Sequence, residues 1–460
     1  MVLTMNIEAF TAMLVEKARA AGFEEYEVFA PLSESFQVRV FAGEIQEFKN
    51  AHNSGVAFRG RIGGRLGYAS TERLDEESAG FVVEQARENA SRIETHSEEP
   101  LHGGSPEYPE VASYEPRLDD VGTDEKCDIT RRLEESALAA DPRVISVDAA
   151  LLGTAQGHTV IANSLGLDIS HRTNIAYAYV MVRVQEGDKS AKVGFDSWAG
   201  RDLSALSVEE LAGKAVAKAI AQIGATKPES GLFRVVLNNE AASDIFATFA
   251  PNFYAENAQK GFSLMAGMQG QRVACDKLSI RDDGYIDGTS GAALGSKPFD
   301  YEGVPTKNKA VVENGILKTL LHNLKSAKKD GVDPTGNGVR RGLGGSVTTG
   351  CGIFYVEPSS LGFEEVLAAA GEGILVTSLM GLHAGANVVS GEFSLQAGGF
   401  LIKDGKIGDP LEQMVVSGNF YSLMNDIIEV GGDIRFDIPS TEGTFGAPSI
   451  LVSSLPVAGV

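Results

Sequence analysis

The sequence has few cysteines and no long hydrophobic run. The three cysteines lie far apart and form no C-x-x-C pair: Cys127, Cys275 and Cys351. This spacing argues against a disulfide scaffold and against a structural zinc site built from cysteine pairs. No stretch approaches the roughly 18 apolar residues of a transmembrane helix, and Glu8 and Lys17 interrupt the first apolar stretch. We therefore expect a cytoplasmic protein with neither signal peptide nor membrane anchor.

Positive charge is also scarce. The chain has 40 lysines and arginines against 62 aspartates and glutamates, a net charge of −22, and contains no long basic run. Binding to nucleic acid through its phosphates requires a patch of lysine and arginine. We therefore expect an acidic, solvated surface and no direct contact with nucleic acid.

The first half of the chain alternates helical and strand patterns, as in an α+β domain. Asp75 and Ser207 are placed to cap two of the helices. Helices are predicted at about 6–22, 75–93, 123–140 and 207–223. Strands are predicted at about 35–41, 144–152, 158–163 and 167–184, with a turn at 163–166 between the last two. A short meander or hairpin is predicted at about 56–68, where glycines at 60, 63 and 64 interrupt the strand pattern.

The second half changes character. Short β-branched runs lie between glycine-rich turns, with helices predicted only at about 241–250, 363–370 and 419–429. Gly224 and Pro228 suggest a boundary, and a proline-rich segment at 97–118 predicts a linker-like loop. We expect an α+β fold: an N-terminal α+β domain (1–225) with helices on an antiparallel sheet, and a large β-rich C-terminal domain (226–460).

Sequence motifs for chemistry are weak. There is no H-E-x-x-H helix, no G-x-S-x-G elbow and no phosphate-binding loop. A zinc site from scattered ligands such as His322, His383 and Cys351 stays open. Cys351 lies in a glycine turn, where it is either a site residue or a small buried hydrophobe.

Two acids, Asp300 and Glu302, alternate with aromatic residues. On a strand both would face one side, where they could act as an acid/base pair. The competing interpretation is that they make structural hydrogen bonds, either in a turn or between subunits.

Ten short motifs follow one another along roughly 400 residues: GVAFR (55–59), GRLGYA (64–69), PFDYEGVPT (298–306), ENGIL (313–317), PTGN (334–337), GAN (385–387), SGEFS (390–394), GGFLI (398–402), SGN (417–419) and FGAPS (445–449). In their order and spacing these motifs resemble the TldD/PmbA (TldE) family, also known as peptidase U62 and formerly as modulator of DNA gyrase.

The resemblance implies the PmbA/TldE branch. TldD-type members carry a zinc-binding HExxxH helix and a late cysteine ligand. Here Phe246 and Pro251 stand in place of the two histidines and Ala247 in place of the glutamate, and no cysteine follows Cys351. The resemblance therefore implies that this chain binds no zinc, has no catalytic residues of its own, and is inactive alone.

The resemblance also implies a role. Family members form two-fold dimers around a cavity, and a TldD-type partner would supply zinc for cleaving unfolded or extended peptides. The partner would be a TldD-type subunit or a second copy of this chain. The candidate cavity residues are Asp300, Glu302, Asn337, Arg340, Cys351, His383 and Asn387, and the glycine-rich segments 342–352 and 381–399 are candidate cavity or edge elements.

Two alternatives remain at this stage. One is an autonomous homodimeric metallopeptidase or other hydrolase with scattered ligands. The other is a protein-binding regulatory module of the gyrase-modulator type.

Overall fold

The computed structural model describes residues 6–94, 99–288, 291–344 and 346–459. Its helices are α1 (Ile7–Ala20), α2 (Glu76–Arg92), α3 (Pro116–Asp119), α4 (Thr123–Ala140), α5 (Val208–Ala221), α6 (Asn239–Phe249), α7 (Ala255–Gln259), α8 (Leu324–Asp330), α9 (Phe363–Ala370), α10 (Leu382–Gly385) and α11 (Phe420–Asn425).

The first half contains strands β1 (Glu25–Phe41), β2 (Glu44–Ser54), β3 (Val56–Ile62), β4 (Arg65–Thr71), β5 (Val144–Asn163), β6 (Asp168–Val184) and β7 (Lys192–Gly200). The second half contains β8 (Gly231–Leu237), β9 (Ile280–Asp283), β10 (Lys309–Glu313), β11 (Ile316–Leu317), β12 (Gly338–Arg340), β13 (Val347–Thr349), β14 (Ile353–Val356), β15 (Gly373–Met380), β16 (Glu392–Lys403), β17 (Lys406–Asn419), β18 (Ile427–Val430), β19 (Arg435–Phe436), β20 (Thr444–Ala447) and β21 (Ile450–Gly459).

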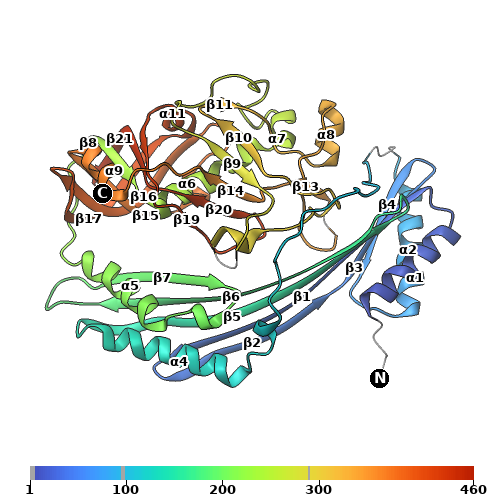
Figure 1. Cartoon of the computed structure of the whole chain (residues 1–460), viewed down its shortest axis with the longest axis horizontal. Helices are drawn as coiled ribbons and strands as arrows, with labels where there is room; N and C mark the ends of the chain where they lie inside the picture. Colours follow the sequence, from blue (N-terminus) through green and yellow to red (C-terminus); the bar gives the residue numbers. More distant parts are fainter. Residues whose placement is uncertain (1–5, 95–98, 289–290, 345, 460) are drawn as a thin grey trace.

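Strands β1 to β7 form one antiparallel sheet in the order β4-β3-β1-β5-β6-β7, with β2 paired to β1. The pattern along β6 shows why it forms a strand here: alternate residues from Ala176 to Val184 are buried and those between them are partly exposed. The long strands run across the molecule beneath the C-terminal part (Figure 1).

Helices cover the two ends of this sheet. At one end α1 and α2 bury Phe10, Leu14 and Val82 against β1 and β3. At the other end α4 and α5 bury Leu133 and Val216 against β5, β6 and β7. The two expected caps are present, since the Asp75 side chain accepts from Ser78 N and the Ser207 side chain accepts from Glu210 N. The two helix pairs account for two separate apolar cores on one sheet.

The C-terminal part contains two six-stranded sheets, in the orders β11-β10-β9-β14-β20-β19 and β17-β16-β15-β8-β21-β18. A further pairing of β17 with β21 closes β8, β15, β16, β17 and β21 into a ring. Helix α6 lies in the core shared by these sheets, together with side chains from β8, β14 and β15.

The expected α+β fold class is confirmed, but several elements differ from the prediction. Residues 144–163 form one continuous strand instead of two. The helix predicted at 419–429 covers only Phe420–Asn425, because Ile427–Val430 joins β21 as strand β18. Of the loop predicted at 97–118, residues 97 and 98 lie outside the described residues, 99–115 contain no helix or strand, and α3 begins at Pro116.

No helix in the described part of the chain is both long enough and apolar enough to cross a membrane.

Candidate functional site

Helix α6 is where the sequence resemblance places a zinc-binding helix in TldD-type relatives, and here it belongs to an aromatic core. Phe246 is 1% exposed, and its ring lies 5.5 Å from the ring of Phe420, measured between centroids. Phe249, one turn further on, stacks on Phe420 at 4.7 Å. This face of the helix is therefore filled by phenyl rings that pack with one another.

The residues at these positions do not fit a zinc ion. Zinc in proteins is held by nitrogen, oxygen or sulfur atoms, and the side chains of Phe246, Ala247 and Pro251 offer none. The helix also ends at Phe249, and Pro251 lies in the 3-10 turn η2 (Ala250–Phe253) that follows it.

The scattered ligands considered as an alternative do not come together. Among the residues that the structure describes, no three His, Cys, Asp or Glu side chains form a group that could hold a metal ion. His322 is buried, whereas His383 is exposed in the short helix α10. The alternative of a zinc site made by His322, His383 and Cys351 is therefore not supported.

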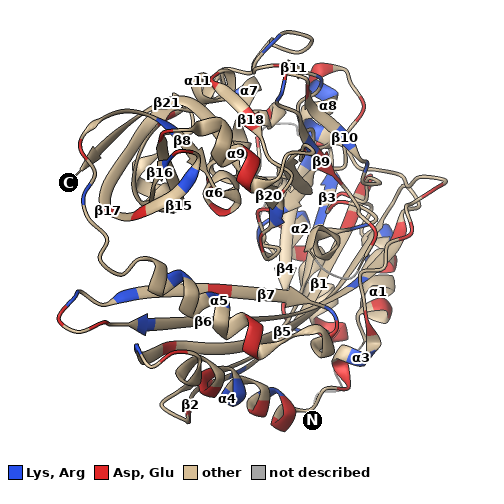
Figure 2. Cartoon of the chain, turned by 60° about the vertical axis from the view of Figure 1, so that its left-hand side comes forward, with Lys and Arg blue, Asp and Glu red and all other residues tan. Residues whose placement is uncertain are grey.

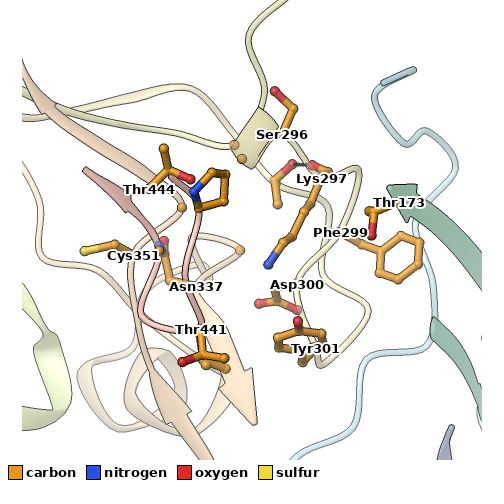
Figure 3. Close-up of a pocket in the computed structure, with 18 of the residues that line it drawn as sticks. Thr173, Ser296, Lys297, Phe299, Asp300, Tyr301, Asn337, Cys351, Thr441 and Thr444 are labelled. Atoms are coloured by element: carbon orange, nitrogen blue, oxygen red, sulfur yellow. Dashed lines mark hydrogen bonds between the residues drawn. The ribbon is translucent and has the colours of Figure 1, made fainter. Parts of the chain in front are cut away.

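A cavity of about 230 Å³ lies where β6 of the N-terminal sheet meets loops of the C-terminal part (Figure 3). Three of the candidate residues line it: Asp300, Asn337 and Cys351. Thr173, Lys297 and Thr444 also line it, although they are more than 100 residues apart in the sequence. The cavity is thus a product of the tertiary fold, and both halves of the chain build it.

Asp300 organises a tight turn at the cavity wall. Its Oδ1 accepts hydrogen bonds from Glu302 N at 2.8 Å and Val304 N at 3.0 Å, and its Oδ2 accepts from Gly338 N at 2.7 Å. Residues 300–303 form a turn, closed by Gly303 at φ +80°, and not a strand. The strand that would have placed Asp300 and Glu302 on one face is therefore absent, but the turn still brings their carboxyls together.

The two carboxyls flank Gly338. A Cβ at position 338 would lie 2.8 Å from Glu302 Oε2 and 3.0 Å from Asp300 Oδ2, so only glycine fits there. Burial raises the pKa of Asp300 to about 6, although three backbone N–H groups oppose this rise. Burial and the neighbouring Asp300 charge raise the pKa of Glu302 to about 8. Both carboxyls therefore keep their protons to a higher pH than free carboxylic acids do.

Asn337 and Cys351 belong to a second buried polar cluster, centred on Asp282. The Asp282 carboxylate accepts from Lys309 Nζ, Asn337 Nδ2 and Gly352 N, each at 2.8 Å. Cys351 Sγ lies 3.4 Å from the Tyr254 hydroxyl. Burial, followed by the Asp282 charge, raises the pKa of the Cys351 thiol well above its usual range. A thiol held neutral in this way is a poor nucleophile.

Arg340 lies behind the cavity wall and joins the two halves of the chain. Its guanidinium donates to Tyr301 O at 3.2 Å, forms an ion pair with Glu27 of β1, and stacks over the Phe29 ring at 4.7 Å. Arg59 of β3 donates to both Glu27 oxygens, at 2.9 and 3.2 Å. The two guanidiniums hold the pKa of Glu27 below its usual value despite its burial.

The remaining candidates lie apart from the cavity. Asn387 is exposed, and its Oδ1 accepts hydrogen bonds from Val389 N and Ser390 N at 3.1 Å. Such local bonds from an asparagine side chain to the following backbone stabilise a turn. His383 is likewise on the surface. The first glycine-rich segment, 342–352, contributes Cys351 and Gly352 to the cavity. In the second segment, 381–399, residues 392–399 belong to β16, which is paired on both sides and offers no free edge.

The sequence reasoning missed Lys297 and Thr444, which line the cavity, and Arg201, which lies behind it. Lys297 directly precedes the PFDYEGVPT stretch and Thr444 precedes FGAPS, so both lie next to quoted motifs. Arg201 is 2% exposed and donates to four backbone carbonyls, including those of Asn174 and Leu294. No local sequence signal indicates such a buried arginine.

Comparison with family models covers most of the chain. The descriptions are PmbA/TldA metallopeptidase domain 1 for residues 26–90, central domain for 116–223 and C-terminal domain for 230–459. A metalloprotease PmbA homologue of Haemophilus influenzae is 25% identical over 98% of this chain and 95% of its own length. Metalloprotease PmbA of Escherichia coli O157:H7 is 25% identical over 86% of this chain and 83% of its own.

Solved structures agree with these matches. A Thermotoga maritima protein described as a proposed modulator of a DNA gyrase superposes with a TM-score of 0.88 at 33% identity, covering 98% of this chain and 100% of that one. TldE of Thermococcus kodakarensis superposes with a TM-score of 0.87 at 25% identity and the same coverage. This chain therefore belongs to the PmbA/TldD metallopeptidase family.

Proposed function

We propose that this chain is a non-catalytic, TldE-type subunit of a cytoplasmic zinc metalloprotease complex, and that a TldD-type partner supplies the zinc. The observation that carries the proposal is helix α6, where Phe246, Ala247 and Pro251 offer no metal ligand and no base. A hydrolytic zinc site needs ligands for the ion and a group that handles the proton of the attacking water. The likeness to TldE of Thermococcus kodakarensis supports the same assignment.

The role of such a subunit is to complete the chamber and to hold an unfolded or extended peptide. An unpaired strand edge binds any extended chain through backbone hydrogen bonds and largely ignores its side chains. Strand β2 (Glu44–Ser54) pairs only with β1 among the described strands, so it is the better candidate for such an edge than β16. A homodimer of this chain would contain two copies of α6 and no HExxxH helix.

The test is co-expression with a TldD-type protein that carries HExxxH, followed by purification through a tag on this chain. The expected result is a stable pair that cleaves an unfolded peptide. This chain alone should not cleave the peptide, and neither should a pair in which the HExxxH glutamate of the partner is replaced by glutamine. Zinc-dependent cleavage by this chain alone would overturn the proposal.

A second candidate is a regulatory role through a protein partner, favoured by the gyrase-modulator description of the Thermotoga maritima relative. Direct contact with DNA does not suit the net charge of −22, and the ribbon in Figure 2 shows several Asp and Glu positions, coloured red, along helices α1 and α4. A pull-down that returns a topoisomerase and no TldD-type protein would favour this candidate over the first.

A further inference from the structure

The cavity contains an ammonium group, that of Lys297. The Lys297 side chain extends into the cavity in Figure 3. Its Nζ lies 5.0 Å from the centroid of the Tyr301 ring, and no carboxylate of a described residue lies within ion-pair distance of it. By contrast, Lys309 in the neighbouring cluster is paired with Asp282 at 2.8 Å. Lys297 is therefore the charged donor in the cavity that is free to bind a ligand.

The wall behind Lys297 adds positive charge. Arg201 is buried and donates to carbonyls that include those of Ser113 and Leu294, and no described carboxylate compensates its charge. His171 lies nearby, and burial, followed by the charges of Lys297 and Arg201, lowers its pKa to about 4. One side of the cavity is thus positive in a protein with a net charge of −22.

The two carboxylates at the cavity wall, Asp300 and Asp282, form ion pairs or hydrogen bonds with groups other than Lys297. Asp300 has both oxygens engaged by three backbone N–H groups. Asp282 is engaged by Lys309, Asn337 and the backbone. The negative charges nearest to the cavity are therefore held by other donors.

A hydroxyl stands on the wall formed by β20. Thr444 is 2% exposed, lines the cavity, and its side chain makes no hydrogen bond to a described residue. Gly295 packs against it so closely that a Cβ there would lie 2.1 Å from Thr444 Oγ1. Because Thr444 lines the cavity, its hydroxyl can be satisfied by a water or by a ligand bound there.

We propose that this cavity binds a carboxylate, with the Lys297 ammonium as its ion-pair partner and the Thr444 hydroxyl as a hydrogen-bond donor. The carboxylate is the C-terminus of a short peptide or that of a free small acid. A volume of about 230 Å³ suits a terminal residue with its carboxylate and not a long chain, since pockets for drug-sized ligands are roughly 300–1,000 Å³. Binding of a peptide C-terminus rests on the proposed function, because it presumes that peptides are the substrates. Binding of a carboxylate as such is independent of that function.

The test is calorimetric titration of the full chain, without a partner, with three probes. They are N-acetylated trialanine with a free C-terminus, the same peptide with a C-terminal amide, and succinate. The expected result is that the free acid binds at least about tenfold more tightly than the amide, as charge-assisted hydrogen bonds predict. Succinate binding as tightly as the free peptide assigns the site to small acids, and weaker succinate binding assigns it to a peptide end.

The variants are Lys297→Met and Thr444→Val, with Lys307→Met as the control because Lys307 is an exposed lysine on the same loop. Lys297→Met should remove the preference for the free acid, Thr444→Val should weaken binding several-fold, and Lys307→Met should leave it unchanged. Circular dichroism and thermal unfolding establish that each variant is folded. Equal binding of acid and amide, or an unchanged preference in folded Lys297→Met, would overturn this inference while leaving co-purification with a TldD-type partner untouched.

Discussion

Replacing Glu302 with glutamine should stabilise the protein at alkaline pH. Glu302 is 2% exposed and has a pKa raised to about 8, above its ordinary value of 4.5. The folded state therefore binds a proton more tightly than the unfolded state, and stability falls as the pH rises between these two values. Each rise of one pH unit between the unfolded-state and folded-state pKa values lowers the free energy of unfolding by about 1.4 kcal/mol. Ionisation of Glu302 alone should therefore lower the free energy of unfolding by about 2 kcal/mol between pH 6 and pH 8.

Glutamine cannot ionise, and its side-chain oxygen can still accept the hydrogen bond that Leu324 N donates to Glu302 Oε2 at 2.7 Å. Urea unfolding at pH 6 and pH 8 measures the effect. The expected result is that Glu302→Gln gains about 2 kcal/mol relative to the wild type when the pH is raised from 6 to 8, while Glu229→Gln at an exposed position follows the wild type. The reasoning is refuted if Glu302→Gln has the same pH dependence as the wild type.

Two further changes test the buried clusters. Glu27→Gln should cost about 3–5 kcal/mol in urea unfolding, because it leaves the buried guanidiniums of Arg59 and Arg340 without their anion; an equally stable variant would contradict this. Phe246→Ala should cost about 3–5 kcal/mol by opening a cavity in the aromatic core, whereas Phe81→Ala, at a side chain that is 61% exposed, should cost under about 1 kcal/mol. Similar losses for both phenylalanine variants would refute the core assignment.

The sequence predicts elements well where a local pattern decides them and poorly where neighbours decide them. Caps such as Asp75 are local, and they are found as expected. The sequence predicts two strands, at about 144–152 and 158–163, where the structure has β5, and Gly153 and Gly157 lie between them. The structure keeps the strand continuous because β1 and β6 pair with it on both sides, with Gly153 opposite Gln37 and Tyr177. Tertiary pairing thus overrides a weak local preference.

The cavity could be predicted only in part. Asp300, Asn337 and Cys351 lie in or beside motifs that carry the family resemblance, so the sequence identifies them as candidates. Lys297 and Thr444 were missed because they meet only when β6, the 284–306 loop and β20 come together. The spacing of residues along the chain does not predict which distant segments the tertiary fold brings together.

In the function proposed above, this chain holds no catalytic zinc and acts with a partner that does. Metal analysis of the chain purified alone, combined with its native mass, tests this most directly, followed by the same analysis of its complex with a TldD-type protein. We expect far less than one zinc per chain in the lone protein and about one zinc per pair in the complex. One tightly held zinc per chain in the lone protein, with cleavage of an unfolded peptide, would contradict it.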